Sequence, residues 1–124
     1  MSVKWYGDEI LLKLREKATP EMIAKAAFLI EAQAKVNVTN NGQVDTGFMR
    51  SSIYANTPLG NTYEHDERAN PMVEPPSGAG LVAVAAEYGI FQEARIPFLY
   101  PAAETVAEQV TAEIVSIGRE ALND

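Results

Sequence analysis

The residues whose types could do chemistry form three short clusters. Glu64-His65-Asp66-Glu67 offers carboxylates and an imidazole, which are common metal ligands, but neighbours in one polar stretch converge poorly on a single ion. Ser51-Ser52 has no second histidine or lysine pattern close by that would activate a hydroxyl for nucleophilic attack. Gly78-Ala79-Gly80 lacks the lysine and the strand–loop–helix context of a phosphate-binding loop. The sequence therefore predicts no metal and no cofactor.

Asp45-Thr46-Gly47 is the tripeptide of aspartic proteases, in which two aspartates share a proton and activate water. One copy in 124 residues would suit a homodimeric, retroviral-type protease that uses Asp45. That fold is almost entirely β, however, and its motif follows a buried apolar strand, whereas Asn40-Asn41-Gly42-Gln43 and a single valine precede this one. We favour a structural interpretation, in which Asp45 caps a short helical turn over residues 46–50 and Gly47 permits close packing.

The composition describes one acidic domain. The 124 residues carry a net charge of −7, with no cysteine and one histidine, which excludes a disulfide framework and Cys-ligated zinc. Residues 1–50 hold seven basic and six acidic side chains, whereas residues 51–124 hold three basic and eleven acidic ones. Because phosphate binding needs clustered lysine and arginine, we expect no specific binding of DNA. The longest apolar runs, 26–30 and 81–86, are too short for a membrane span, and no apolar leader opens the sequence, so we expect a cytoplasm-like compartment.

Helical patterns dominate the two ends of the sequence. Residues 3–6 suggest a short strand, and residues 8–18 a first helix, because Ile10, Leu11 and Leu14 recur at helical spacing. Thr19-Pro20 begins a long central helix that should run to about residue 36 or 38, where the turn Asn40-Asn41-Gly42 ends it. A C-terminal helix is indicated by one apolar stripe, made of Ala103, Val106, Val110, Ile114, Ile117 and Ala121.

Between these helices the pattern changes to strands. Residues 53–57 and 81–86 suggest two antiparallel partners, and residues 88–101 a connection rich in aromatics and proline. The polar, proline-rich stretch at about 60–80 predicts a long flexible loop. The predicted fold class is therefore α+β, with a small antiparallel sheet packed with a long central helix and a long C-terminal helix, in a single domain over residues 1–124.

Two segments of the chain stand out when they are taken together. The first is Val44-Asp45-Thr46-Gly47-Phe48-Met49-Arg50-Ser51-Ser52-Ile53, and the second is Tyr88-Gly89-Ile90-Phe91-Gln92-Glu93 followed by Pro97-Phe98-Leu99-Tyr100-Pro101-Ala102. They resemble the "(P)VDTGxLRxSI", "YAxYVExGT" and "PFLxPA" segments of the tail-completion (head–tail joining, minor tail component) proteins of long-tailed bacteriophages. Order and spacing agree over most of the chain, although Ala94-Arg95 replaces the family's Gly-Thr.

The resemblance implies a structural virion protein rather than an enzyme. Proteins of that family form a ring, usually a hexamer, at the head-proximal end of the tail. The ring would bind the tail tube protein and the head-completion or stopper protein of the connector, with DNA passing through its lumen. The expected location is the tail–neck region of the virion, and the host cytoplasm during assembly. The aspartic protease and another neck component, a stopper or an adaptor, remain the alternatives.

The resemblance also marks residues. The family motif falls on Asp45, Thr46, Gly47, Arg50, Ser52, Tyr88, Phe91, Glu93, Pro97, Phe98 and Pro101. The polar loop carries no family motif. We predict that it docks on a partner ring through Tyr63, Glu64, Asp66, Arg68, Met72 and Val73.

Overall fold

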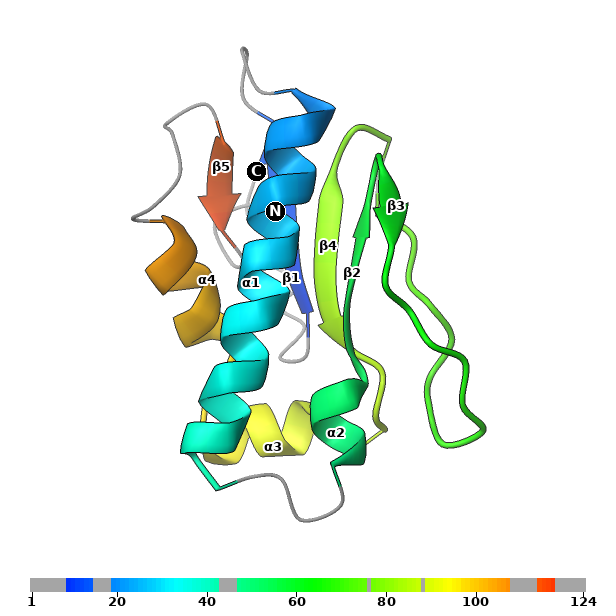
Figure 1. Ribbon diagram of the computed structural model, residues 1–124, viewed down its shortest axis with the longest axis vertical. Helices are drawn as coiled ribbons and strands as arrows, with labels where there is room; N and C mark the ends of the chain where they lie inside the picture. The colour runs from blue at the N-terminus through cyan, green and yellow to red at the C-terminus, as the bar shows by residue number, and fades with distance from the viewer. Residues whose placement is uncertain are drawn as a thin grey trace, which may run out of the picture.

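The computed structural model describes residues 9–14, 19–42, 47–75, 77–87, 89–107 and 114–117 (Figure 1). In chain order its elements are β1 (Glu9–Leu14), α1 (Pro20–Asn40), α2 (Phe48–Ser51), β2 (Ile53–Thr57), β3 (Gly60–Asn61), β4 (Gly80–Val84), α3 (Gly89–Arg95), α4 (Leu99–Ala107) and β5 (Ile114–Ile117). The strands form one antiparallel sheet in the order β3-β2-β4-β1-β5. Figure 1 shows α1 lying across one face of this sheet, with α4 beside it. The predicted α+β class and the long central helix are confirmed.

The central helix α1 begins as its sequence predicts and runs slightly beyond the predicted end, to Asn40. The Thr19 hydroxyl accepts a hydrogen bond from the Met22 amide at 3.2 Å, and Pro20 occupies the first helical position, where no amide hydrogen is needed. The helix ends before Asn41 and Gly42, whose φ of 74° suits glycine. Its buried face packs into the main core through Ile23, Ala26, Ala27, Ile30, Ala34 and Val38.

The predicted pairing of the two middle strands is confirmed, because β2 and β4 are antiparallel with Ile53 opposite Val84. Their side chains alternate between the two faces of the sheet. One set joins the main core under α1 and α4, namely Ile53, Ala55, Val82 and Val84. The other set forms a second apolar cluster on the opposite face, namely Tyr54, Leu81, Ala83 and Ala85.

The helix predicted over residues 8–18 is wrong wherever the structure describes that segment. Residues 9–14 form β1, which pairs with β4 on one side and with β5 on the other. A short run such as Ile10-Leu11-Leu12 satisfies helical spacing and also the continuous apolar pattern of an interior strand. Pairing with β4 and β5 makes this segment a strand and not a helix. The strand predicted at residues 3–6 lies outside the described residues.

The long C-terminal helix is wrong in its second half. The structure gives α4 over Leu99–Ala107 and then a strand, β5, over Ile114–Ile117. Leu12 pairs with Ile117, and Leu14 with Ile114. Three of the four residues of β5 are β-branched, which favours strands when a partner is present. The connection predicted over residues 88–101 also contains a helix, α3, which the sequence pattern did not indicate.

Part of the predicted loop contacts the second face of the sheet. The Asn70 amide donates to the Ala85 carbonyl at 2.6 Å, and the Val73 amide donates to the Tyr54 hydroxyl at 3.0 Å. The Tyr63 ring meets the Tyr54 ring edge-on, with centroids 5.1 Å apart, and its hydroxyl donates to the Asn70 carbonyl at 2.7 Å. The second apolar cluster is covered by Tyr63, Ala69 and Met72. The flexibility of this stretch stays a prediction.

Candidate functional site

The second motif segment is anchored on the C-terminal end of α1. The Asn37 side-chain amide donates to the Phe98 carbonyl at 3.0 Å, and the Asn41 side-chain amide donates to the Pro97 carbonyl at 3.2 Å. Asn37 is itself held by Gln33, whose side-chain nitrogen donates to Asn37 Oδ1 at 3.0 Å. The Phe98 side chain is fully buried in the main core. The end of the central helix therefore positions the Pro97–Phe98 turn.

The first motif segment reaches the same end of α1 through α2. Arg50 Nη1 donates to Thr39 Oγ1 at 3.1 Å. Gly47 stands at the N-cap of α2 with a φ of 71°, and an added Cβ would meet no atom within 4 Å. Its role is thus the left-handed backbone and not the close packing that we predicted. Asp45 and Thr46, including the predicted Asp45 cap, lie outside the described residues.

Ser52 connects α2 to the end of β4. Its hydroxyl donates to the Met49 carbonyl at 2.7 Å and accepts from the Ala86 amide at 3.1 Å. The Ser52 carbonyl also accepts from the Ala85 amide at 3.0 Å. Ser52 is buried, so these bonds replace water for groups that would otherwise be left unpaired. Because the Ser52 hydroxyl is bonded to two backbone groups of the fold, it is not positioned to act as a nucleophile.

Glu93 is a buried carboxylate that caps α4. Its Oε1 accepts from the Phe98 and Leu99 amides at 2.9 and 2.8 Å, and its Oε2 accepts from the Tyr100 amide at 3.1 Å. Pro101, the next residue, has no amide hydrogen to satisfy. The carboxylate and the proline together account for the amides at the start of α4. The negative charge also lies at the positive end of the helix dipole.

The predicted docking loop contributes a pocket against α2. The Arg68 guanidinium lies over the Phe48 ring, 4.0 Å from its centroid. It also donates two hydrogen bonds to the Asp66 carboxylate, from Nε to Oδ1 at 3.0 Å and from Nη2 to Oδ2 at 2.9 Å. The open cavity between α2 and the loop has a volume of about 350 Å³. It is lined by Gly47, Phe48, Ser51, Ser52, Glu64, His65, Asp66 and Arg68. The loop therefore meets the first motif segment directly.

The hydrogen bond from the Arg68 side chain, assisted by one from the Arg68 amide, lowers the pKa of Asp66 from 3.8 to about 2. Because the folded pKa lies below the unfolded value, the contact is fully present above about pH 4 and is lost as the pH falls toward 2. Replacing Arg68 with alanine should raise the pKa of Asp66 part of the way to 3.8, since the backbone amide remains.

Carboxyl-carbon NMR titration measures this pKa. Arg95→Ala, which removes an exposed arginine in α3, is the matched control and should leave the titration of Asp66 unchanged. A native Asp66 that titrates near 3.8 would contradict the Arg68 contact.

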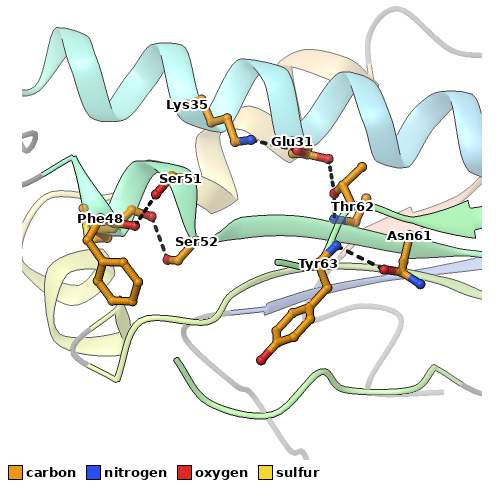
Figure 2. A network of polar contacts seen from close by, with 10 residues as sticks. Glu31, Lys35, Phe48, Ser51, Ser52, Asn61, Thr62 and Tyr63 are labelled. Carbon is orange, nitrogen blue, oxygen red and sulfur yellow. Dashed lines mark hydrogen bonds and ion pairs between the residues drawn. The ribbon is translucent and has the colours of Figure 1, made fainter. Parts of the chain in front are cut away.

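A second polar network, which the sequence did not indicate, connects the start of the loop to α1 (Figure 2). Glu31 Oε2 accepts from Lys35 Nζ at 2.8 Å, and its Oε1 accepts from the Thr62 hydroxyl at 2.7 Å. The same Thr62 hydroxyl accepts from the Ala55 amide at 2.9 Å. Glu31 is buried on α1, so the network anchors the chain just after β3 between helix and sheet. Glu31 and Lys35 have the i, i+4 spacing of a common helical ion pair. The third member of the network, Thr62, lies 31 residues after Glu31, so sequence spacing does not indicate it.

The remaining predicted residues fall in different surroundings. Glu64 is exposed and lines the pocket, Met72 is half-buried on the second apolar cluster, and Val73 is 41% exposed. Tyr88 lies outside the described residues, as does the side chain of Phe91 in α3. Within the described ranges, no group of three histidine, aspartate or glutamate side chains could hold a metal ion.

No protein-family model, curated protein or solved structure matches the chain. Among the described helices, none combines the length and the apolar character needed to cross a membrane.

Proposed function

We propose that this protein is a structural component of a long-tailed bacteriophage. It forms a hexameric ring at the head-proximal end of the tail, completes the tail and joins it to the head connector. The observation that carries the proposal is the pair of motif segments that resemble tail-completion proteins, which share one support at the C-terminal end of α1. Polar side chains of the two segments, such as Ser52 and Glu93, form hydrogen bonds with backbone amides. Such contacts suit a structural role and not a catalytic one.

A ring needs an interface between two different surfaces whose rotation closes. The sheet supplies candidate surfaces at its two described edges, β3 and β5. A neighbouring copy could add backbone hydrogen bonds along such an edge. In this proposal the ring binds the tail tube protein on one side and the stopper protein of the connector on the other. DNA passes the acidic protein without specific binding.

The docking loop supports the second contact. Glu64, Glu67 and Val73 are exposed on it, while Tyr63 and Met72 hold it on the sheet. The loop thus combines anchored and exposed side chains, which suits a surface that meets another protein. We propose that the exposed side chains contact the connector ring.

The experiment compares head–tail joining between variants in the phage that encodes the chain. Deletion of residues 62–78 should abolish joining and leave separate heads and tails in electron micrographs. Because that deletion also uncovers the second apolar cluster, the surface variant Glu64→Ser/Val73→Ser is the more specific change. It should reduce joining at least tenfold while the protein folds normally, and Glu87→Ser, another exposed site, should join at the native yield. Normal joining by the surface variant would overturn the docking role of the loop.

The virion role has a separate test. Purified chain added to tail tubes should give closed rings with sixfold symmetry at one end, as seen by electron microscopy. The Asp45→Asn variant should form the same rings. Failure to bind tubes, together with peptide cleavage that Asp45→Asn abolishes, would overturn the structural proposal in favour of the protease.

A further inference from the structure

The sequence contains one Asn–Gly pair, Asn41–Gly42, and it lies at the C-terminal end of α1. The other six asparagines are each followed by a residue that carries a side chain. Asparagine is a thermolabile residue, because its side-chain amide can be attacked by the backbone nitrogen of the next residue. Glycine in that next position removes the Cβ that would hinder the attack and lets the backbone rotate freely. The sequence therefore concentrates this reactivity at one place.

We propose that Asn41 is a deamidation site, whose reaction releases the Pro97–Phe98 turn from its second anchor on α1. A base in the solvent removes the Gly42 amide proton, and the Gly42 nitrogen attacks Asn41 Cγ. The new C–N bond closes a five-membered imide ring, the bond from Cγ to Nδ2 breaks, and the side-chain nitrogen leaves as ammonia. One water molecule then opens the ring at either carbonyl carbon. The product is an aspartate, or an isoaspartate in which the backbone continues through Cγ.

The folded structure holds the reacting groups out of position. The Gly42 amide donates to the Thr39 carbonyl at 3.1 Å, and the Asn41 side-chain amide donates to the Pro97 carbonyl at 3.2 Å. Asn41 also has a helical backbone, with φ of −78° and ψ of −7°. Ring closure requires the Gly42 nitrogen to rotate toward the Asn41 side chain, so this end of the helix must open first.

The end of α1 is a part of the fold that can open locally. Helix termini are among the least stable parts of a folded protein, and they fray without unfolding of the core. Gly42 is exposed, and a Cβ placed on it would meet none of the described atoms within 4 Å, so the described structure leaves room for its movement. We therefore expect the reaction to proceed from a briefly opened last turn.

The product lacks a donor that the native fold uses. The side chain of aspartate or isoaspartate has no N–H group, so the hydrogen bond to the Pro97 carbonyl is lost. A carboxylate there also repels the carbonyl oxygen and adds negative charge at the negative end of the α1 dipole. The bond from Asn37 to the Phe98 carbonyl remains. The turn of the second motif segment therefore keeps one of its two described anchors on α1.

This inference goes beyond the proposed ring and does not depend on it. Arg50 contacts the Thr39 side chain, so the first motif segment keeps its contact with α1 after the reaction. Deamidation thus acts on the support of one motif segment and not on that of the other. Its tests use the purified chain alone, so a failure to bind tails or connector would count against the proposed function and not against this inference.

Mass spectrometry of the incubated protein tests the reaction. Trypsin releases residues 36–50 as one peptide, in which fragmentation distinguishes Asn37, Asn40 and Asn41. At mildly alkaline pH this peptide should gain the mass of an acid in place of an amide at Asn41, and it should separate into aspartate and isoaspartate forms. Asn41 should react at least tenfold faster than every other asparagine, since only Asn41 is followed by glycine. Reaction at Asn41 no faster than at Asn40 would overturn the proposal.

Protection by the fold is tested with the same peptide. In urea the unfolded chain should react at Asn41 at least tenfold faster than the folded chain, because the Gly42 amide is then released from Thr39. Asn41→Gln retains a side-chain amide but would have to close a six-membered ring, so it should not react at this position. Equal rates in the folded and unfolded chains would show that the end of α1 does not restrain Asn41, and the structural part of the proposal would be wrong.

Asn41→Asp imitates the product and tests its consequence. Amide hydrogen exchange at Leu99, whose amide is bound to Glu93 beside the same turn, should become roughly fivefold faster in this variant. Asn40→Asp, which places the same charge on an exposed side chain one residue earlier, is the matched control and should exchange at the native rate. If the two variants exchange equally at Leu99, deamidation of Asn41 does not release the turn.

Discussion

Replacing Glu93 with alanine should lower the free energy of unfolding by about 3–5 kcal/mol, because it leaves two buried amides and one partly buried amide without an acceptor. The three amides belong to Phe98, Leu99 and Tyr100, at the start of α4. A lost N-cap in an exposed helix costs less, since water replaces the cap. Here water has little access, and the favourable charge at the helix terminus is lost as well.

Urea unfolding, followed by circular dichroism, measures this loss. Glu93→Gln retains one carbonyl oxygen for Phe98 and Leu99 but loses the charge and presents an amide group to Tyr100, so we expect a smaller loss of about 1–2 kcal/mol. Glu87→Ala removes an exposed glutamate and should change stability by less than about 0.5 kcal/mol. If Glu93→Ala is no more destabilising than Glu87→Ala, the capping role of Glu93 is wrong.

The second large effect is expected at Gly89, the first residue of α3. A Cβ there would lie 2.6 Å from Val84 Cγ1 and 2.9 Å from Val84 Cβ, in the main core. Real atoms do not approach so closely, so either α3 or the end of β4 must move. Gly89→Ala should therefore destabilise the protein by about 1–3 kcal/mol, although alanine is the better helix former.

A double-mutant cycle isolates this contact. Val84→Ala alone removes buried methyl groups and should destabilise by about 1–3 kcal/mol. In the Val84→Ala background the closer contact, with Cγ1, is removed, and only the 2.9 Å approach to the Cβ of residue 84 remains. The double variant should therefore be more stable than the sum of the two losses, by about 1 kcal/mol. Thermal and urea unfolding of the four proteins give this coupling. Strict additivity would show that Gly89 is not placed by its contact with Val84.

The parts of the fold that sequence predicted well are those determined by local signals. The central helix has a capping threonine, a proline at its first position and a glycine just after its end, all within reach of the backbone groups that they serve. The pairing of β2 with β4 follows from two short segments that each suit a sheet. These signals lie within the segments themselves, so they can be recognised without knowing how the rest of the chain folds.

The errors share a physical cause. The residues of β1 and β5 carry apolar spacings that suit either a helix or a buried strand. Each becomes a strand because it pairs with a distant part of the chain, β5 with β1 and β1 with both β4 and β5. Sequence periodicity does not report such pairing. α3 was missed for a different reason, since it is short and bracketed by Gly89 and Pro97, which usually indicate a turn.

For the candidate site, the resemblance marked residues but did not indicate their contacts. The motif residues Ser52, Glu93 and Phe98 were marked by resemblance, whereas the acceptor role of Glu93 depends on a turn that brings three amides onto one carboxylate. Nothing in the sequence indicated the side-chain contacts of Asn37, Asn41 and Thr62, because their partners lie in other parts of the chain. Contacts of this kind depend on the packed arrangement and not on neighbours in sequence.

The position of β1 between β4 and β5 has a consequence for how the protein is made. β1 leaves the ribosome first among the described strands, yet both of its partners are translated much later. Until then its apolar run and both of its edges are open to other chains, which favours aggregation. Contacts between distant residues also slow folding, so we expect the sheet to form in milliseconds to seconds, after residues 114–117 have emerged. A chaperone that holds the first strand during translation would therefore raise the yield of folded protein.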